Sequence, residues 1–330
     1  MSFEKNDTLE NILTEVNRLL APVEERERNN VGKPEYPNLF LVGTSRCGST
    51  LFTQWAASLG VFSYPSNFLS RFYKAPYVGA LIYEIVTNPK YQYKNEFSDI
   101  EEEIEFESSI GKTKGFKAPH EFWYFWREFI DFPDIPFSDE EFSQKFNFED
   151  FQKELALIQK AFGKPFLCKA KIVNSYLKSM AEHTENSIFL HMYREPTEVI
   201  RSLLKAREKW TGSSDNWFAW KPREYPELIT MDRYHQVAGQ VYFTEREIRS
   251  SREYLGDRYL KFSYKEFCVN PASVYYKISK QIKKLAPSFV ITDYHGIEKF
   301  NRSENRSAIN GAIQVAYTYF LEKYGELENS

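Results

Sequence analysis

The sequence predicts an α/β fold in which a central parallel β-sheet is flanked by helices. Short apolar runs alternate along the chain with segments of helical periodicity, and the run at 38–42 ends in a glycine-rich turn that leads into a helix. Strands that alternate with helices form parallel sheets, because each helix carries the chain back to the start of the next strand. With 330 residues, the chain is long enough for one large domain or two small ones.

The N-terminal part predicts a helix and a linker before the main domain. Apolar residues recur at helical spacing over 8–20, which indicates an amphipathic helix. The charged stretch that follows contains a glycine and two prolines, so we expect a linker or exposed crossover up to residue 35. The remaining residues, 36–330, are expected to form a single domain.

Four apolar runs of the main domain are expected to be strands. They lie at 38–42, 166–171, 187–194 and 259–264. A helical pattern follows each run, and Pro196 suits the first turn of the helix after the third strand, where a missing N–H costs nothing. The stretch 89–150 is rich in Glu, Asp and Phe, and we interpret it as a cap-like helical and loop insertion over the sheet.

Composition restricts the classes of function and location. The formal net charge of −3 favours neither nucleic acid nor acidic membranes as a partner, so a small ligand is expected. Cys47, Cys168 and Cys268 are widely spaced and form no C-x-x-C pair, which disfavours a disulfide scaffold or a zinc site and indicates a reducing compartment. No apolar stretch reaches signal-peptide or membrane-spanning length. We therefore expect a soluble, cytoplasmic protein, as a monomer or a homodimer.

The glycine-rich turn "FLVGTSRCGST" has the spacing of a phosphate-binding loop. Gly43 and Gly48 are separated by four residues, and Ser49 and Thr50 follow. ATP- and GTP-binding loops carry a lysine directly after the second glycine, whereas this loop has Ser49 there and Arg46 as its nearest cation. Backbone N–H groups at the start of the next helix would hold an anion. An ordinary tight turn with an incidental arginine is the alternative.

A second pattern decides between these interpretations. Arg194 ends a predicted strand, and Ser202 lies eight residues later in the next helix. Together the two segments resemble the sulfotransferase family that uses 3′-phosphoadenosine 5′-phosphosulfate (PAPS). In that family a P-(K/R)-S-G-(S/T)-T loop holds the 5′-phosphosulfate and a later R-x7-S element holds the 3′-phosphate. Ser45 to Thr50 stand at the first element, and the resemblance covers about 38–205.

The resemblance implies a P-loop-like three-layer fold and transfer of the sulfuryl group from PAPS. PAPS would be the co-substrate, no metal would be needed, and the acceptor would offer a hydroxyl, or less readily an amine, on a small molecule, a carbohydrate or a lipid. Arg46 would stabilise the charge on the leaving 5′-phosphate. The cofactor-binding residues would be Arg46, Cys47, Gly48, Ser49, Thr50, Lys169, Arg194, Ser202, Tyr264 and Arg306.

Three of these assignments carry alternatives or qualifications. Lys169, in "CKAKI", fits the family's second cation. Tyr264 would lie against the adenine, although a buried tyrosine at a strand end is equally expected. Arg302 or Arg306 would reach the 3′-phosphate, unless this basic segment is a solvated loop.

Several positions depart from the family pattern. Ser45 replaces a proline, and Leu51 replaces the aromatic residue that stacks on adenine in the cytosolic branch. The histidine that acts there as general base is replaced by Lys171, which is a poor base while it is charged. His120 and Glu121, beside the ring-rich run "FWYFWREF", are therefore the candidate catalytic bases. For His120 a purely structural role is the alternative.

Two other functions stay open at this point. A variant P-loop kinase would bind ATP with Mg²⁺, but Ser49 in the place of the lysine argues against it. A PAPS-binding protein that has lost its base would bind the nucleotide normally and transfer nothing, and the change to Lys171 allows this.

Overall fold

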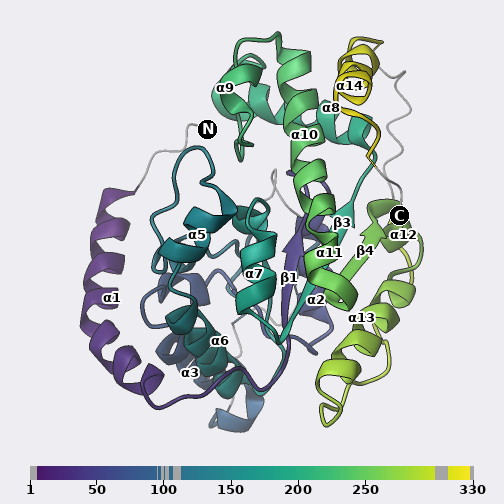
Figure 1. Cartoon of the computed structure of the whole chain (residues 1–330). Coiled ribbons are helices and arrows are strands. Elements are labelled where there is room, and N and C mark those ends of the chain that lie inside the picture. The colour runs from purple at the N-terminus through teal and green to yellow at the C-terminus, as the bar shows by residue number, and fades with distance from the viewer. Residues whose placement is uncertain are drawn as a thin grey trace.

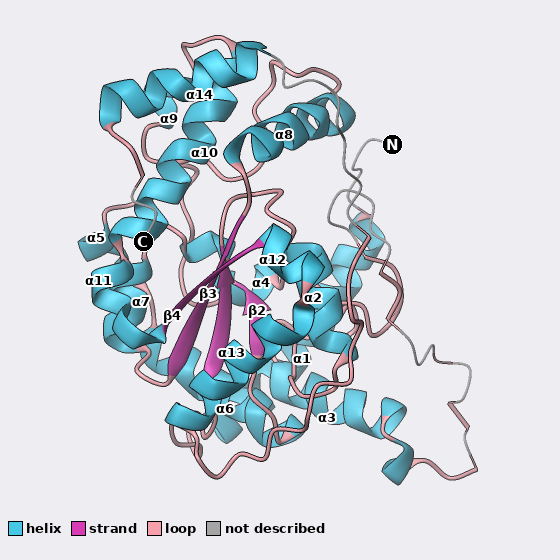
Figure 2. Cartoon of the chain, turned by 90° about the vertical axis from the view of Figure 1, so that its right-hand side faces the viewer, coloured by secondary structure: helices cyan, strands magenta, loops and turns pink. Residues whose placement is uncertain are grey.

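A four-stranded parallel sheet forms the centre of the computed structural model, which describes residues 6–94, 96–97, 100, 104–106, 113–301 and 311–327. The strands are β1 (Asn38–Val42), β2 (Leu167–Lys169), β3 (Ser187–Tyr193) and β4 (Tyr259–Ser263), and their order in the sheet is β2-β1-β3-β4. Helices lie on both faces of the sheet (Figure 1; Figure 2). The predicted α/β fold with a central parallel sheet is confirmed.

Helices connect these strands and build the layers on either side. The described α-helices are α1 (Asp7–Arg28), α2 (Ser49–Ser58), α3 (Pro76–Thr87), α4 (Trp123–Arg127), α5 (Asp139–Lys145), α6 (Phe148–Phe162), α7 (Leu177–His183), α8 (Pro196–Thr211), α9 (Tyr225–Leu228), α10 (Arg233–Ser250), α11 (Arg252–Leu255), α12 (Tyr264–Val269), α13 (Pro271–Leu285) and α14 (Gly311–Tyr324). Short 3₁₀ turns lie at Leu69–Arg71, Pro89–Tyr91, Lys171–Val173 and Gly256–Arg258. The helix predicted after each strand is present.

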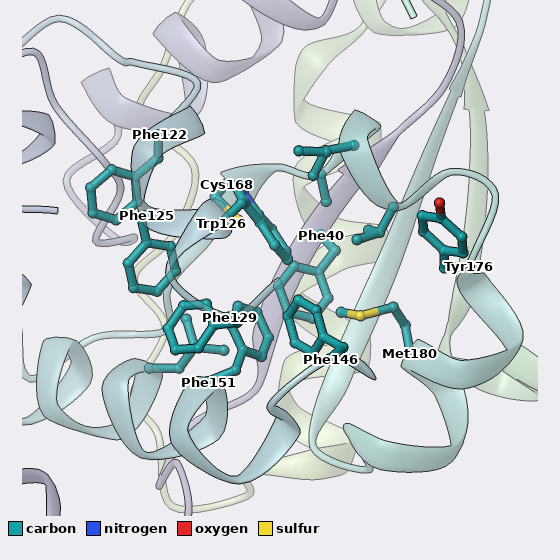
Figure 3. Packing of buried hydrophobic residues seen from close by; sticks show 14 of the residues in the cluster. Phe40, Phe122, Phe125, Trp126, Phe129, Phe146, Phe151, Cys168, Tyr176 and Met180 are labelled. Carbon is teal, nitrogen blue, oxygen red and sulfur yellow. The ribbon is translucent and has the colours of Figure 1, made fainter. Parts of the chain in front are cut away.

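Alternate residues of β1 face two different hydrophobic cores, as the pleat of a strand requires. Leu39 and Leu41 pack with residues of α2, α12 and α13 on one face. Phe40 joins an aromatic cluster on the other face, beneath α4, α6 and α7, which is drawn in Figure 3. There the ring centroids of Phe40 and Trp126 lie 6.0 Å apart. Much of the ring-rich run 122–129 therefore serves as core.

A third group of helices lies beyond the ends of the strands, where α8, α10 and α14 pack together (Figure 1). Val199 and Leu203 of α8 meet Val237 and Val241 of α10 in this cluster, and Phe320 of α14 completes it. The cluster places α8, which carries Ser202, beside the turn that follows β1.

Helix α1 is longer than the sequence predicted. It continues to Arg28 instead of ending at residue 20, and Pro22 lies inside it. Buried contacts hold its second half against the domain. Glu24 accepts a hydrogen bond of 2.6 Å from the backbone N–H of Tyr77, and Arg28 pairs with Glu154 of α6 over 3.0 Å. Tertiary contacts thus extend the helix into the stretch predicted as a linker.

Candidate active site

The turn between β1 and α2 has the backbone geometry of an anion-binding loop. Gly43 and Gly48 have φ angles of 141° and 105°. A Cβ atom on Gly43 would lie 2.6 Å from the carbonyl oxygen of Met192, so a side chain there is excluded. Because α2 begins at Ser49, the unbonded N–H groups of its first turn and the positive end of its dipole lie at the loop.

Asn174 fixes the start of this loop. Its side-chain Nδ2 donates to the carbonyl oxygen of Gly43 over 3.1 Å, and the N–H of Gly43 donates to its Oδ1 over 3.4 Å. The side chain is buried, with 3% exposure. Asn174 was not predicted as a site residue, because it lies outside both motifs and no spacing rule points to it.

The two predicted nucleotide-binding segments meet in the fold. Nε of Arg46 donates to Oγ of Ser202 over 3.2 Å. Nη1 of Arg194 donates to the backbone carbonyl oxygen of Arg46 over 3.4 Å, and its Nε pairs with Glu198 over 2.9 Å. The loop after β1 and the segment from the end of β3 into α8 therefore form one site.

Tyr264 covers the loop from the end of β4. A Cβ atom on Gly48 would lie 2.3 Å from the ring of Tyr264, so the ring packs directly on this glycine. The guanidinium group of Arg194 lies 4.6 Å from the centre of the same ring, a cation–π distance. Tyr264 thus lies at the loop and contacts two predicted binding residues, Gly48 and Arg194. A tyrosine packed only in the core would not make these contacts.

Lys169 and Glu121 lie beside the first turn of α2. Nζ of Lys169 donates to Oγ1 of Thr50 over 3.0 Å and pairs with Oε1 of Glu121 over 3.4 Å. Nε1 of Trp123 donates to the second carboxylate oxygen of Glu121 over 2.7 Å. The side chain of Lys169 is 3% exposed and that of Glu121 is 36% exposed, so only the carboxylate is open to a second substrate.

Positive charge dominates the electrostatics of the site. Burial lowers the pKa of Lys169, and the Glu121 carboxylate offsets this effect only in part. Burial raises the pKa of Glu121, but Lys169 and Lys171 outweigh it, so the pKa of this carboxyl lies below its ordinary value. Burial and the neighbouring Arg194 lower the pKa of Arg46. Such a group of cations around one loop suits an anionic ligand.

Two solved structures are similar to this chain in fold. Sulfotransferase STF9 from Mycobacterium avium matches with a TM-score of 0.52 and 14% identity, over 98% of this chain and 86% of that one. Sulfotransferase STF1 from Mycobacterium tuberculosis H37Rv matches with a TM-score of 0.50 and 12% identity, over 92% of this chain and 76% of that one. The chain has the sulfotransferase fold. No family model and no curated protein matches its sequence.

His120, the other candidate base, lies in the turn just before α4. Its Nδ1 accepts a hydrogen bond of 3.0 Å from the backbone N–H of Phe122, and the backbone N–H of His120 donates to the carbonyl oxygen of Pro65 over 2.7 Å. Phe122 is buried and has a φ of 59°, an uncommon conformation for a bulky residue. The ring of His120 therefore helps to hold a strained turn that carries Glu121.

The remaining predicted site residues are Cys47, Arg302 and Arg306. Cys47 is fully buried, and its N–H donates to the carbonyl oxygen of Thr44 over 3.3 Å, inside the loop. Arg302 and Arg306 lie outside the described residues.

In the described part of the chain, no group of three His, Cys, Asp or Glu is placed to hold a metal ion. None of the helices in this part of the chain is long and apolar enough to cross a membrane. A cavity of about 510 Å³ lies at the far end of α2, between Tyr64, Tyr83 and Lys164, and does not include the loop.

Proposed function

We propose that this protein is a PAPS-dependent sulfotransferase. The observation that carries the proposal is the hydrogen bond from Arg46 to Ser202, because it joins the loop expected at the 5′-phosphosulfate to the helix expected at the 3′-phosphate. A nucleotide with phosphate groups at both positions needs two adjacent cationic segments, and Arg194 supplies the second. The sulfotransferase fold supports the same assignment.

Each part of the donor nucleotide is assigned to its own group of residues. The N–H groups at the start of α2, with Arg46 and Lys169, hold the 5′-phosphosulfate. Arg194 and Ser202 hold the 3′-phosphate. Tyr264, which packs on the loop, lies against the adenine.

Glu121 is assigned as the general base in preference to His120. Its carboxylate is partly exposed and lies 3.4 Å from the ammonium of Lys169, which itself contacts the loop. The Nδ1 of His120 is already bonded to the backbone, so its free capacity as a base is smaller. The low pKa of Glu121 keeps it ionised at neutral pH, and an anionic donor that draws Lys169 away would raise that pKa toward a more effective value.

The transfer then proceeds in one displacement. The acceptor hydroxyl gives its proton to the Glu121 carboxylate while its oxygen forms a bond to sulfur. The bond between sulfur and the bridging oxygen of the 5′-phosphate breaks, and the electron pair stays on that oxygen. Arg46 and Lys169 stabilise the charge that develops there. The products are the sulfated acceptor and adenosine 3′,5′-bisphosphate, and the proton leaves Glu121 for the solvent.

Two measurements test this function together. Calorimetric titration with adenosine 3′,5′-bisphosphate should show binding without Mg²⁺, and radiolabelled PAPS should transfer its label to at least one member of a panel of phenols, sugars, hydroxylated lipids and amines. A kinase with a variant loop would instead bind ATP and require Mg²⁺. Bisphosphate binding without transfer to any acceptor would identify an inactive PAPS-binding protein. Absence of bisphosphate binding would refute the proposal.

A further inference from the structure

A small cavity lies beside the loop, against Thr44 and Ser45. Its walls come from Thr44, the 3₁₀ turn that begins at Lys171, helices α8 and α10, and Trp220. Its free volume of about 10 Å³ is close to the space that one water molecule needs.

Three of the residues that line this cavity each carry a buried polar atom with no hydrogen-bond partner among the residues that the structure describes. These atoms are Oγ1 of Thr44, Nε1 of Trp220 and Oε1 of Gln240. Thr44 is 2% exposed and Gln240 is 4% exposed, so bulk solvent does not reach these side chains. Buried polar groups without partners are costly, and a native protein rarely leaves three around one cavity.

The orientation of the Gln240 amide follows from its other contacts. Its nitrogen donates to the carbonyl oxygens of Phe218, over 3.0 Å, and Trp220, over 2.7 Å. Because both partners are acceptors, that end of the amide is the NH₂ group, and the end without a partner is the oxygen. The cavity is therefore lined by one obligatory donor, the indole N–H, one obligatory acceptor, the amide oxygen, and one hydroxyl that does either.

We propose that one ordered water molecule occupies this cavity and hydrogen-bonds to Thr44, Trp220 and Gln240. A water accepts from the indole and donates to the amide oxygen at the same time. A bare anion would leave the amide oxygen without a donor, and a bare cation would leave the indole N–H without an acceptor. Only a hydroxylic oxygen meets all three needs, and the volume admits one.

The bound water connects the loop, through Thr44, to the turn that carries Trp220. These two segments share no direct hydrogen bond through the three unpartnered atoms. Thr44 lies two residues before Arg46 in the loop, and Trp220 belongs to a turn in which Ala219 has a φ of 68°. Gln240 holds that turn from α10. The water thus makes the loop and the turn mutually dependent for stability, with or without a nucleotide.

A double-mutant cycle on melting temperature tests this inference without any nucleotide. Thr44→Val and Trp220→Phe each remove one partner of the water, and each should lower the melting temperature by about 2 °C or more. The double variant should lose about 2 °C less than the sum of the two single losses, because the same water is lost only once. Thr44→Ser, which keeps the hydroxyl, should stay within about 1 °C of the wild type.

Additive losses in the cycle would overturn the inference, and so would a Thr44→Val variant as stable as the wild type. A crystal structure of the wild-type protein gives the second readout. It should show one density peak within hydrogen-bond distance of all three atoms. A dry cavity in a map that shows ordered water elsewhere in the interior would also overturn it. Neither readout depends on PAPS, so failure here is separate from failure of the proposed function.

Discussion

Nε of Arg46 donates a 3.2 Å hydrogen bond to Oγ of Ser202, although 156 residues separate them in the chain. The same hydroxyl is proposed to contact the 3′-phosphate of the donor. Because a hydroxyl can accept and donate at the same time, Ser202 can keep this bond and donate its own proton to that phosphate. A single hydroxyl would in this way join the 3′-phosphate to the guanidinium group expected at the 5′ end.

The first prediction concerns Arg46. Arg46→Ala should lower the turnover number for sulfuryl transfer by about 10²- to 10³-fold, because it removes a cation from the developing charge. Affinity for adenosine 3′,5′-bisphosphate should fall less, since the N–H groups of α2 and Lys169 remain. Initial rates with radiolabelled PAPS and calorimetric titration measure the two effects. Arg252→Ala, an exposed arginine on α11, is the matched control, and full turnover in R46A would show that the loop has another role.

The second prediction separates the 3′-phosphate from the rest of the nucleotide. Arg194→Ala should weaken binding of adenosine 3′,5′-bisphosphate by about 10- to 100-fold, the usual value of a hydrogen bond to a charged group. Binding of AMP, which lacks the 3′-phosphate, should change much less. Competition titrations of both ligands give the ratio. Equal losses for both would mean that Arg194 only supports Tyr264 and the backbone of Arg46.

The third prediction tests the base. Glu121→Gln keeps the size of the side chain and an oxygen for Lys169 but cannot take a proton, so turnover should fall by about 10²- to 10⁴-fold with bisphosphate affinity retained. Because the pKa of Glu121 is lowered below its ordinary value of 4.5 in the free protein, kcat/KM should show no acidic limb from this group above that value. Glu253→Gln, on the exposed side of α11, is the control. Unchanged turnover in E121Q would transfer the role to another residue, with His120 the first to test.

A fourth prediction comes from a buried pair of carboxyl groups far from the loop. Glu24 of α1 and Glu154 of α6 are 1% and 3% exposed. Glu154 accepts a hydrogen bond from Arg28 over 3.0 Å, and Arg28 also lies 3.5 Å from Asp150. Glu24 accepts the N–H of Tyr77 at the start of α3. Burial and the neighbouring Glu24 raise the pKa of Glu154 to about 9, so the pair shares a proton at neutral pH.

The folded protein therefore binds a proton at Glu154 that the unfolded chain, with an ordinary value of 4.5, has released. Stability should fall as pH rises through the window between these two values, by at most about 1.4 kcal/mol per pH unit. Glu154→Gln mimics the protonated form, so its melting temperature should decline less than that of the wild type between pH 6 and pH 9. Glu149→Gln, exposed on the same helix, is the control. Parallel pH curves for E154Q and wild type would contradict the shared proton.

The sequence predicted the sheet well because the first and third strands combine an apolar run with a clear boundary residue. Gly43 ends the first run and Pro196 opens the helix after the third. Helix α10 was not predicted, since buried polar residues such as Gln236, Gln240 and Glu245 interrupt its apolar pattern. Their partners lie far away in the chain, and only the fold shows that these polar groups are inside.

The candidate site was predictable to a similar degree. Arg46, Arg194 and Ser202 belong to the two motifs that resemble the sulfotransferase family, and the fold brings them together. Asn174 had no such signal, because an amide that binds a backbone from a distant turn leaves no periodicity. Nor could the sequence rank Glu121 above His120, since that order depends on which ring nitrogen and which carboxylate are already bonded.

The pairing of Leu41 with Lys169 restricts how chain length can vary among homologues of this protein. Leu167 and Cys168 face opposite cores, so Lys169 points to the face that carries α2. Loss or gain of one residue within 166–169 would turn its ammonium group into the aromatic cluster. Insertions and deletions between β1 and β2 are therefore expected in the connecting loops, while these four positions keep their spacing.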